Sequence, residues 1–362
     1  MASWRLTQLK PTKDCPMKYA ILLSVLCLSE IACGGIRDGC FDIYWIDVEG
    51  GAATLMVTPT GESILIDTGN PGLRDPNRIV KVATDVAGLK SVDHLITTHY
   101  HGDHFGGAAM LSTLLPIGNV YDNGKFDGMP DNPGREYYEF ACSSRTVMQP
   151  GAELTLKQLA VGPNLRVKCI GTRQQFIEPQ AADADNGQLC AACREKDRDG
   201  SDNANSIVML IDFGNFRFFD GGDLTWNQEM KLVCPNNLLG QVDVYQVTHH
   251  GLDSSNNPVV LQTIQPRVAI MNNGDRKGCL PEVFANLKAL PEIEGIYQLH
   301  KNLRPDGAVN NVEDSCIANH EESAKCSGHF VKLSVAPDSN SYTVSIPSNN
   351  HIREFETKKR AK

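Results

Sequence analysis

The stretch THYHGDHFGG at residues 98–107 is the sequence feature that most constrains how this chain can fold. It directly follows the apolar run VDHLITT, which predicts a buried strand that ends just before the first histidine. Side chains two positions apart on an extended segment point the same way, so His99 and His101 can bind one ion. Beyond the next glycine the chain can turn, and Asp103 and His104 can then face a second ion. Imidazole and carboxylate ligands without a thiolate suit a borderline divalent cation such as zinc, manganese or iron.

The composition of the chain is that of an ordinary globular protein with an excess of acidic residues. The chain has 362 residues, of which 41% are hydrophobic and 21% charged, and its formal net charge is −9 at pH 7. This length is sufficient for one large domain. Dedicated binding of duplex nucleic acid is disfavoured, because it requires a broad basic face. The basic cluster TKKRAK ends the chain, and we expect residues 351–362 to form a polar C-terminal tail.

The N-terminal region carries the pattern of a targeting signal. From Met17 the chain reads MKYAILLSVLCLSEIACGG, with a short basic start, an apolar stretch and then small residues. This order is typical of a secretory signal peptide, and the apolar run is too short to span a membrane comfortably. We therefore expect residues 1–38 to be a targeting segment and the mature protein to be periplasmic or extracellular, without a membrane span. A lipid anchor at Cys33 is the alternative, although Glu30 occupies a position that is usually apolar.

Cysteine usage agrees with export. Twelve cysteines are many for a cytosolic enzyme of this size, and nine of them lie beyond Cys33: Cys40, Cys142, Cys169, Cys190, Cys193, Cys234, Cys279, Cys316 and Cys326. Scattered spacing of this kind predicts that most of them form disulfides in an oxidising compartment. The motif CAAC at residues 190–193 is typical of a zinc ribbon or a redox pair, but no second CxxC completes a ribbon. A structural disulfide or a loop staple is the favoured interpretation.

The rest of the chain alternates predicted strands and helices. The runs CFDIYWIDVEGGAATLMVTP and ESILIDTG predict opening hairpin strands, and DPNRIVKVATDVAGLK and FGGAAMLSTLLPIG predict helices on either side of the histidine motif. This order is α/β. Residues 122–205 are rich in Gly, Pro, Asp and Asn, which predicts long surface loops at the substrate entrance. We expect one domain over residues 39–350.

Polar side chains also follow two other predicted strands. The run FRFFDGGDL ends in Asp223, and VDVYQVTHHG ends in the pair His249 and His250. Strand ends that converge on one edge of a sheet are where α/β proteins place their sites. Taken alone, Asp223 can equally be a turn residue and His249 a buried core histidine. Their order after the first motif favours metal ligands.

These segments resemble the metallo-β-lactamase superfamily, and within it the hydrolase domain of bacterial DNA-uptake (competence) channel proteins. The resemblance rests on four stretches in the family's order, IDVEGGAATLMVTPTGESILIDTG, THYHGDHFGG, NANSIVMLIDFGNFRFFDGGDL and VTHHG, and it covers most of residues 41–300. It implies an αββα four-layer sandwich with a two-metal centre at one edge. By this resemblance one metal takes His99 and His101, the other takes Asp103, His104 and His249, and Asp223 bridges them.

The chain departs from the family pattern in two ways. Many members place another metal-binding histidine between the first motif and the bridging aspartate, whereas this chain has no histidine between His104 and His249. The metal at His99 and His101 therefore has at least one ligand fewer. The competence proteins also carry a multi-span membrane channel that this sequence lacks, so the resemblance implies hydrolysis but not DNA uptake.

The function expected from these features is metal-dependent hydrolysis by a metal-bridged hydroxide, with one or two Zn²⁺ per chain and Mn²⁺ or iron as alternatives. The favoured substrate is a small or short phosphoester, especially a phosphodiester; lactone or β-lactam hydrolysis on the same centre and a diiron redox protein are the alternatives. Asp103 is also expected to accept a proton from the nucleophilic water. Neighbouring strand residues face opposite ways, so only His249 of the histidine pair should be a ligand. His250 is then expected to act in turnover or substrate binding.

Three other polar residues are interpreted individually. His94 is expected to be structural. His300, after a predicted strand, either lines the pocket or has a surface or core role. Asn205 is a candidate for a hydrogen bond to substrate.

Overall fold

The computed structural model describes residue 1, residues 39–180 and residues 183–360, and the part from residue 39 onward forms one compact unit. The expected signal segment and Cys33 lie outside the described residues. No helix in the described part is both long enough and apolar enough to cross a membrane.

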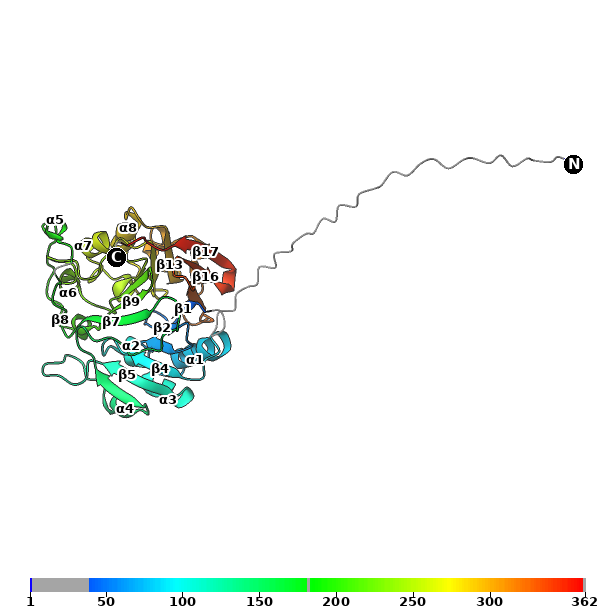
Figure 1. Ribbon diagram of the computed structural model, residues 1–362, viewed down its shortest axis with the longest axis horizontal. Helices are drawn as coiled ribbons and strands as arrows, with labels where there is room; N and C mark the ends of the chain where they lie inside the picture. The colour runs from blue at the N-terminus through cyan, green and yellow to red at the C-terminus, as the bar shows by residue number, and fades with distance from the viewer. Residues whose placement is uncertain (2–38, 181–182, 361–362) are drawn as a thin grey trace. The chain divides into compact units, whose positions relative to one another are not determined.

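Two large sheets form the centre of this unit (Figure 1). The first sheet consists, in spatial order, of β17 (His351–Glu356), β16 (Ser341–Ile346), β15 (Phe330–Val335), β1 (Phe41–Ile46), β2 (Thr54–Val57), β3 (Ser63–Ile66), β4 (Val92–Ile96), β5 (Ile117–Asp122) and β6 (Ser144–Val147). The second consists of β14 (Ile317–Asn319), β13 (Gly295–His300), β12 (Val268–Met271), β11 (Val244–Gln246), β10 (Phe216–Asp220), β9 (Val208–Phe213), β7 (Leu165–Thr172) and β8 (Gln175–Phe176). In each sheet a run of parallel strands adjoins antiparallel ones.

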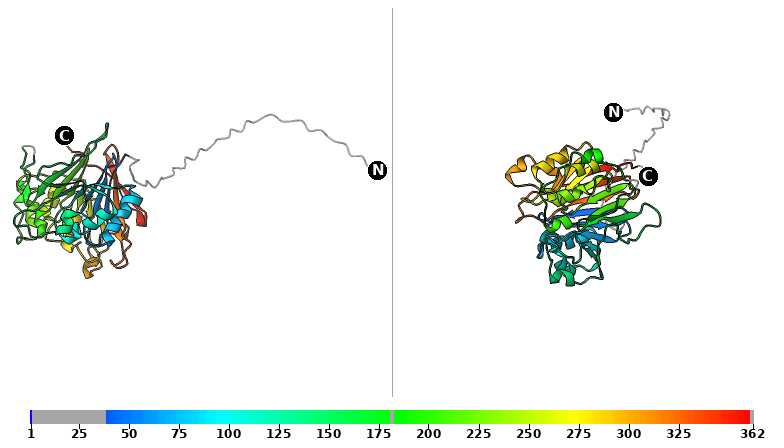
Figure 2. Two further views of the ribbon diagram at one scale, coloured as in Figure 1. Left: turned by 90° about the horizontal axis from the view of Figure 1, so that it is seen from below. Right: turned by 90° about the vertical axis from the view of Figure 1, so that its left-hand side faces the viewer.

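Helices cover the outer faces of the sheets. Figures 1 and 2 show one group beside the first sheet and another beside the second. The first group comprises α1 (Arg74–Lys81), η1 (Val82–Val86), α2 (Gly102–Phe105), α3 (Ala108–Leu114) and α4 (Arg135–Glu139). The second comprises α5 (Gly187–Cys190), α6 (Trp226–Met230), α7 (Pro258–Ile264) and α8 (Pro281–Lys288). Short 3-10 turns, η2 (Asp202–Asn205) and η3 (Thr248–Gly251) among them, lie in the connections.

The buried side chains explain why these layers stack. All six residues of β1 are buried, but they alternate between two cores. Ile43 and Trp45 pack between the sheets. There the ring of Trp45 makes an edge-to-face contact with the ring of Phe218, from the second sheet, with 5.5 Å between the centroids. Tyr44 faces the other way, into the core between the first sheet and α1 and α3. A third core lies between the second sheet and α7 and α8. Three cores separate four layers, which confirms the predicted αββα sandwich.

The C-terminal segment corrects one expectation. Residues 351–356, predicted as part of a polar tail, form the edge strand β17, paired antiparallel with β16. The composition HIREFE is polar, but Phe355 is buried and stacks on Tyr342 at 5.4 Å between ring centroids. Phe355 is directed into the inter-sheet core, and six residue pairs with β16 join the strand to the sheet.

The cysteines correct a second expectation. In the described part of the chain the structure contains one disulfide, Cys190–Cys234, which joins the end of α5 to the segment after α6. Cys193 of the CAAC motif is a thiol. Cys169 and Cys279 are also thiols and are fully buried in hydrophobic cores, where burial raises the pKa of each to about 12. Hydrophobic packing, rather than cross-linking, explains these two cysteines.

Candidate metal centre

The histidine motif follows β4, as the sequence predicts. His99 follows the C-terminal end of the strand and has no exposed surface. The centroid of its ring lies 4.7 Å from that of the His101 ring. The His101 backbone is extended and precedes α2, which carries Asp103 and His104. His101 is less enclosed: its side chain is 30% exposed, and its Nε2 lies 3.4 Å from Asp131 Oδ2. The motif thus places one buried and one accessible imidazole side by side.

Four side chains from three elements converge next to this motif. Asp103 and His104 come from α2, Asp223 from the loop after β10, and His250 from η3; one ligand atom of each lies within 4.8 Å of the others. The Nε2 atoms of His104 and His250 are 3.3 Å apart, and they lie 3.1 and 3.2 Å from Asp223 Oδ2. Ligand atoms around a tetrahedral zinc ion with bonds of about 2.1 Å are separated by roughly 3.4 Å. The four atoms therefore have the spacing of a coordination shell.

The turn before Asp223 requires a glycine. Gly222 has a φ of +55°, and a Cβ there would lie 3.0 Å from the Cβ of Thr98 and 3.3 Å from that of Ser206. The Asp223 backbone N–H donates to Ser206 Oγ at 3.2 Å. The close approach of this turn to the end of β4 brings the carboxylate of Asp223 to the histidine motif.

Both histidines of the group are oriented by a second contact. Asp67 Oδ2 lies 2.7 Å from Nδ1 of His104, and the carbonyl of Asn272 lies 3.2 Å from Nδ1 of His250. In the neutral form of each ring, which a metal would require, a proton on Nδ1 leaves Nε2 with a lone pair directed at the group. Metal-binding histidines commonly donate their other nitrogen in this way, which fixes the tautomer and the ring orientation.

The histidine pair lies differently from the arrangement that strand alternation predicted. Alternation along an extended strand predicted that only His249 would face the site. Instead, His249 and His250 both have a φ of +54°, so the strand has ended and alternation no longer applies. His250 belongs to the four-residue group, whereas His249 Nε2 lies 3.6 Å from Asp223 Oδ2 and 3.3 Å from Asn203 Nδ2. His250 is therefore placed as the candidate ligand, and His249 lies beside the group.

The charges of the group are strongly coupled. Burial penalises the charge of each member, but the histidines outweigh it and lower the pKa of Asp103 and of Asp223, while the carboxylates raise the pKa of His104 and of His250. Without a metal, protons on these histidines neutralise the carboxylates. The lowered pKa of Asp103 keeps its carboxylate charged, as a metal ligand must be.

His99 has the properties of a ligand that lacks its partner. Burial, followed by repulsion from His104, lowers its pKa, so the ring is neutral. Its Nδ1 faces the hydroxyls of Thr98 and Ser206 at 3.1 and 3.4 Å, whereas its buried Nε2 has no hydrogen-bond partner. A neutral, orphaned nitrogen beside a group with ligand spacing fits a metal centre. In the described part of the chain His99 and His101 do not join a third ligand within 4.8 Å, which agrees with the missing histidine.

Sequence reasoning missed several residues of this site. Lys277 is the most notable, because its ammonium group pairs with Asp103 Oδ2. Lys277 lies in the loop after β12, 174 residues from Asp103 in the sequence, and no local sequence pattern predicts its position. Asp67 does have a signal, since it directly follows the buried strand SILI in the same manner as the motif follows β4.

Two cavities are lined mostly by polar residues, and one of them lies next to His249. One, of about 860 Å³, is lined by Lys196, Trp226 and Ser254, and the Ser254 hydroxyl lies 3.0 Å from His249 Nδ1. The other, of about 520 Å³, is lined by Arg173, Arg198 and Asn205 of η2, among others. Asn205, the candidate for a hydrogen bond to substrate, lies at the wall of this cavity, where its Oδ1 accepts a hydrogen bond from Gln174.

The two remaining histidines differ from each other. His94 is buried, stacks on Tyr121 at 5.9 Å and approaches its hydroxyl at 3.2 Å, which agrees with the expected structural role. His300 is buried away from the four-residue group and contacts Asp47 and Glu49.

Comparison with known proteins finds similarity to the metallo-β-lactamase superfamily over part of the chain. Residues 46–152 match the family model of the metallo-β-lactamase superfamily. "Competence protein ComA" of Neisseria gonorrhoeae is 25% identical over 62% of this chain and 26% of its own length. A metal-dependent hydrolase of Cupriavidus metallidurans is 35% identical over 24% of this chain and 28% of its own length. A mutant of the β-hydroxylase CmlA matches with a TM-score of 0.43 and 15% identity, over 72% of this chain and 52% of that one. The chain spans about a quarter of the length of the curated relatives it matches.

Proposed function

We propose that this chain is a metal-dependent hydrolase of the metallo-β-lactamase superfamily that acts on a small phosphodiester. One observation carries the proposal: the ligand atoms of Asp103, His104, Asp223 and His250 lie within 4.8 Å of one another, next to the orphaned Nε2 of His99. These are the borderline N and O donors that zinc, manganese or iron accepts.

The residues divide into three tasks. Asp103, His104, Asp223 and His250 would hold the tighter ion, and His99 and His101 a second, weaker one. When bound, a divalent ion supplies hydroxide near neutral pH and neutralises charge that develops on the substrate. Asp67 and the Asn272 carbonyl keep the two ligand rings in one orientation.

His249 is assigned to the substrate side of the centre. It lies between Asp223 and the wall of the larger cavity, and its Nδ1 is within hydrogen-bond distance of both Ser254 and Ser255. Burial lowers its pKa. A neutral imidazole in this position can orient a substrate oxygen by donating a hydrogen bond or can accept a proton as a general base.

The preference for a phosphodiester rests on local charge. Lys277 pairs with Asp103 at the centre, and Arg173 and Arg198 line the smaller cavity beside η2 together with Asp127 and Asp199, in a chain whose net charge is −9. Such cations suit a phosphate. The net negative charge disfavours long nucleic acid, so a mononucleotide-sized or other short diester is proposed.

The test is a panel of chromogenic phosphodiester, phosphomonoester, lactone and cephalosporin substrates, assayed with zinc, manganese and iron. We expect the phosphodiester to be turned over fastest, and Asp223→Asn to reduce that rate by roughly 10²-fold or more. His94→Asn serves as the control for replacing a buried polar residue outside the centre. Faster turnover of the lactone or cephalosporin would replace the substrate proposal, and iron-dependent redox activity without hydrolysis would replace the whole function.

We also propose that the chain is exported. The signal-like sequence from Met17 and the Cys190–Cys234 disulfide support this proposal, because disulfides persist in oxidising compartments. Mass spectrometry of protein from its native source should find a mature N-terminus near residue 33, with or without a lipid. An intact residue 1 on a protein without the disulfide would contradict export.

A further inference from the structure

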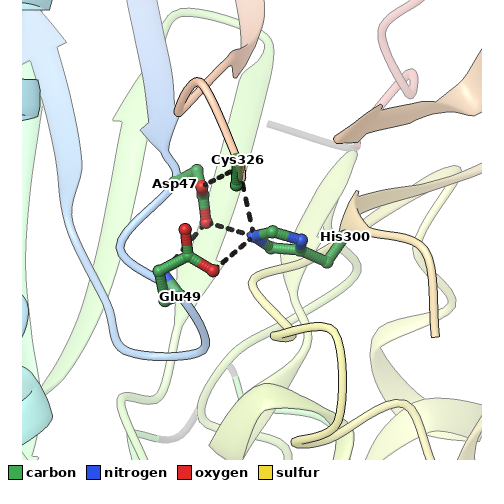
Figure 3. A group of neighbouring side chains, drawn as sticks. All are labelled: Asp47, Glu49, His300 and Cys326. Carbon is green, nitrogen blue, oxygen red and sulfur yellow. Dashed lines mark hydrogen bonds and ion pairs between the residues drawn. The ribbon is translucent and has the colours of Figure 1, made fainter. Parts of the chain in front are cut away.

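A second group of potential ligands lies apart from the HxHxDH centre and shares no residue with it. Asp47 and Glu49 follow β1, His300 ends β13, and Cys326 lies in the loop before β15 (Figure 3). One ligand atom of each lies within 4.8 Å of the others. Residues from three distant parts of the sequence thus direct an imidazole, a thiol and two carboxylates at one point.

The ligand atoms of this group lie close enough together to bind one ion. His300 Nε2 lies 2.7 Å from Asp47 Oδ1, 3.2 Å from Glu49 Oε2 and 3.9 Å from Cys326 Sγ. Roughly 3.4 Å separates neighbouring ligands of a tetrahedral zinc ion, and more where one ligand is the larger sulfur. Figure 3 shows the four side chains pointing toward one another around His300 Nε2.

Arg78 orients the two carboxylates from outside the group. Its Nη1 lies 2.8 Å from Asp47 Oδ2 and 2.8 Å from Glu49 Oε1, which leaves Oδ1 of Asp47 and Oε2 of Glu49 to face His300. Outer contacts of this kind position metal-binding carboxylates and tune their charge.

Burial makes Glu49 the critical member. Asp47 and His300 have no exposed surface, and the Glu49 side chain is only 3% exposed. Neither oxygen of Glu49 makes a hydrogen bond of normal geometry. Its charge is compensated by ion pairs with Arg78 and His300, and the pair with His300 is the one that a bound cation would replace, because Oε2 faces into the group.

The charge balance permits a divalent cation. Without a metal, two carboxylates balance Arg78 and a protonated His300. If an M²⁺ ion binds, His300 loses its proton and Cys326 becomes a thiolate. Two protons leave as two positive charges enter, and the buried group stays neutral.

We propose that Asp47, Glu49, His300 and Cys326 form a second metal site for a divalent transition ion of the zinc class. The mixed thiolate, imidazole and carboxylate donors select such an ion over Mg²⁺ or Ca²⁺, which prefer oxygen ligands. The ion would join the end of β1 to the end of β13 and to the loop that carries Cys326. This site stands independently of the proposed hydrolase activity.

Cobalt substitution tests the site, because the HxHxDH centre contains no thiol. The full chain, stripped with chelator and loaded with Co²⁺, should show a sulfur-to-cobalt charge-transfer band. Cys326→Ser should abolish the band and remove one equivalent of metal, whereas Cys316→Ser, a change at another half-buried thiol, should leave both unchanged. Asp223→Asn should retain the band, which separates this site from the proposed active centre.

A second measurement covers the case in which Cys326→Ser does not fold. In the unmodified chain, zinc should slow alkylation of Cys326 by at least tenfold without protecting Cys142, as read by peptide mass spectrometry. The proposal is overturned if cobalt binds without a charge-transfer band, if the band survives Cys326→Ser, or if zinc leaves the alkylation of Cys326 unchanged. Each of those outcomes would leave His300 as a buried imidazolium held by two carboxylates.

Discussion

Asp67 Oδ2 lies 2.7 Å from Nδ1 of His104, and this contact determines which nitrogen of the ring faces the metal centre. The same carboxylate accepts hydrogen bonds from the backbone N–H and hydroxyl of Thr98, at 2.8 and 2.7 Å. Asp67 therefore joins the end of β3 to the end of β4 and holds the first motif in its ligand geometry.

Replacing Asp67 should weaken metal binding without removing a ligand. Asp67→Asn keeps the shape but loses the acceptor charge, so His104 is held less firmly in the required tautomer. We expect the metal affinity to fall by about 10–100-fold, measured by competition with a chromophoric chelator. Asp243→Asn is the control, because that buried carboxylate bonds the backbone N–H groups of Arg217 and Lys358 instead. Equal losses of affinity in both variants would show a general effect on folding.

The histidine pair gives a direct test of the ligand assignment. His250→Ala should remove the ion and the activity together, since its Nε2 lies within 3.3 Å of His104, Asp103 and Asp223. His249→Ala should retain the ion and lose turnover or substrate affinity. Elemental analysis and kinetics of both variants, with circular dichroism to verify folding, measure this difference. Loss of metal from His249→Ala alone would restore the assignment expected from strand alternation.

These residues show how far the sequence determines the site. Strand ends and the HxHxDH spacing predict Asp103, His104 and Asp223, because local periodicity decides where a strand stops. The choice between His249 and His250 depends on the left-handed backbone of η3, which no hydrophobic pattern encodes. Lys277 and the group around His300 arise from contacts between distant segments. Likewise β17 depends on Phe355 meeting Tyr342, a tertiary contact within an otherwise polar segment.

Lys277 should compete with the metal for Asp103. Its ammonium group pairs with Asp103 Oδ2, the oxygen that lies nearest to His250, so an incoming cation must displace or tolerate it. The lysine side chain is 41% exposed, and pairs of this type contribute about 0–1 kcal/mol. Lys277→Met should therefore tighten metal binding by up to roughly fivefold, measured by calorimetry. Lys301→Met, which breaks an exposed pair with Asp314, is the control; unchanged or weaker binding in Lys277→Met would contradict the competition.

The disulfide should stabilise the helical layer on the second sheet. Cys190 and Cys234 are separated by 44 residues, and closing a loop of this length typically contributes about 2–4 kcal/mol. Reduction, or the double change Cys190→Ser and Cys234→Ser, should lower the free energy of unfolding in urea by that amount. Cys193→Ser should not, because Cys193 is a thiol in the structure. A matching loss in Cys193→Ser would indicate that the pairing differs from the one described.

Glu229 should make the stability of the fold depend on pH. The side chain is completely buried in α6, its Oε2 accepts the backbone N–H of Asn257 at 2.8 Å, and Oε1 has no hydrogen-bond partner. Burial raises its pKa from 4.5 to about 8. Between these values the folded state binds more protons than the unfolded state, so stability falls as pH rises from 4.5 to 8, by at most about 1.4 kcal/mol per pH unit.

Glu229→Gln is neutral at every pH and should lack this contribution, whereas Glu282→Gln, an exposed change on α8, should keep it. The measurement is urea unfolding of the three proteins from pH 5 to 9 at constant metal concentration. If the difference in stability between the unmodified chain and Glu229→Gln stayed constant over this range, Glu229 would already be ionised in the folded protein.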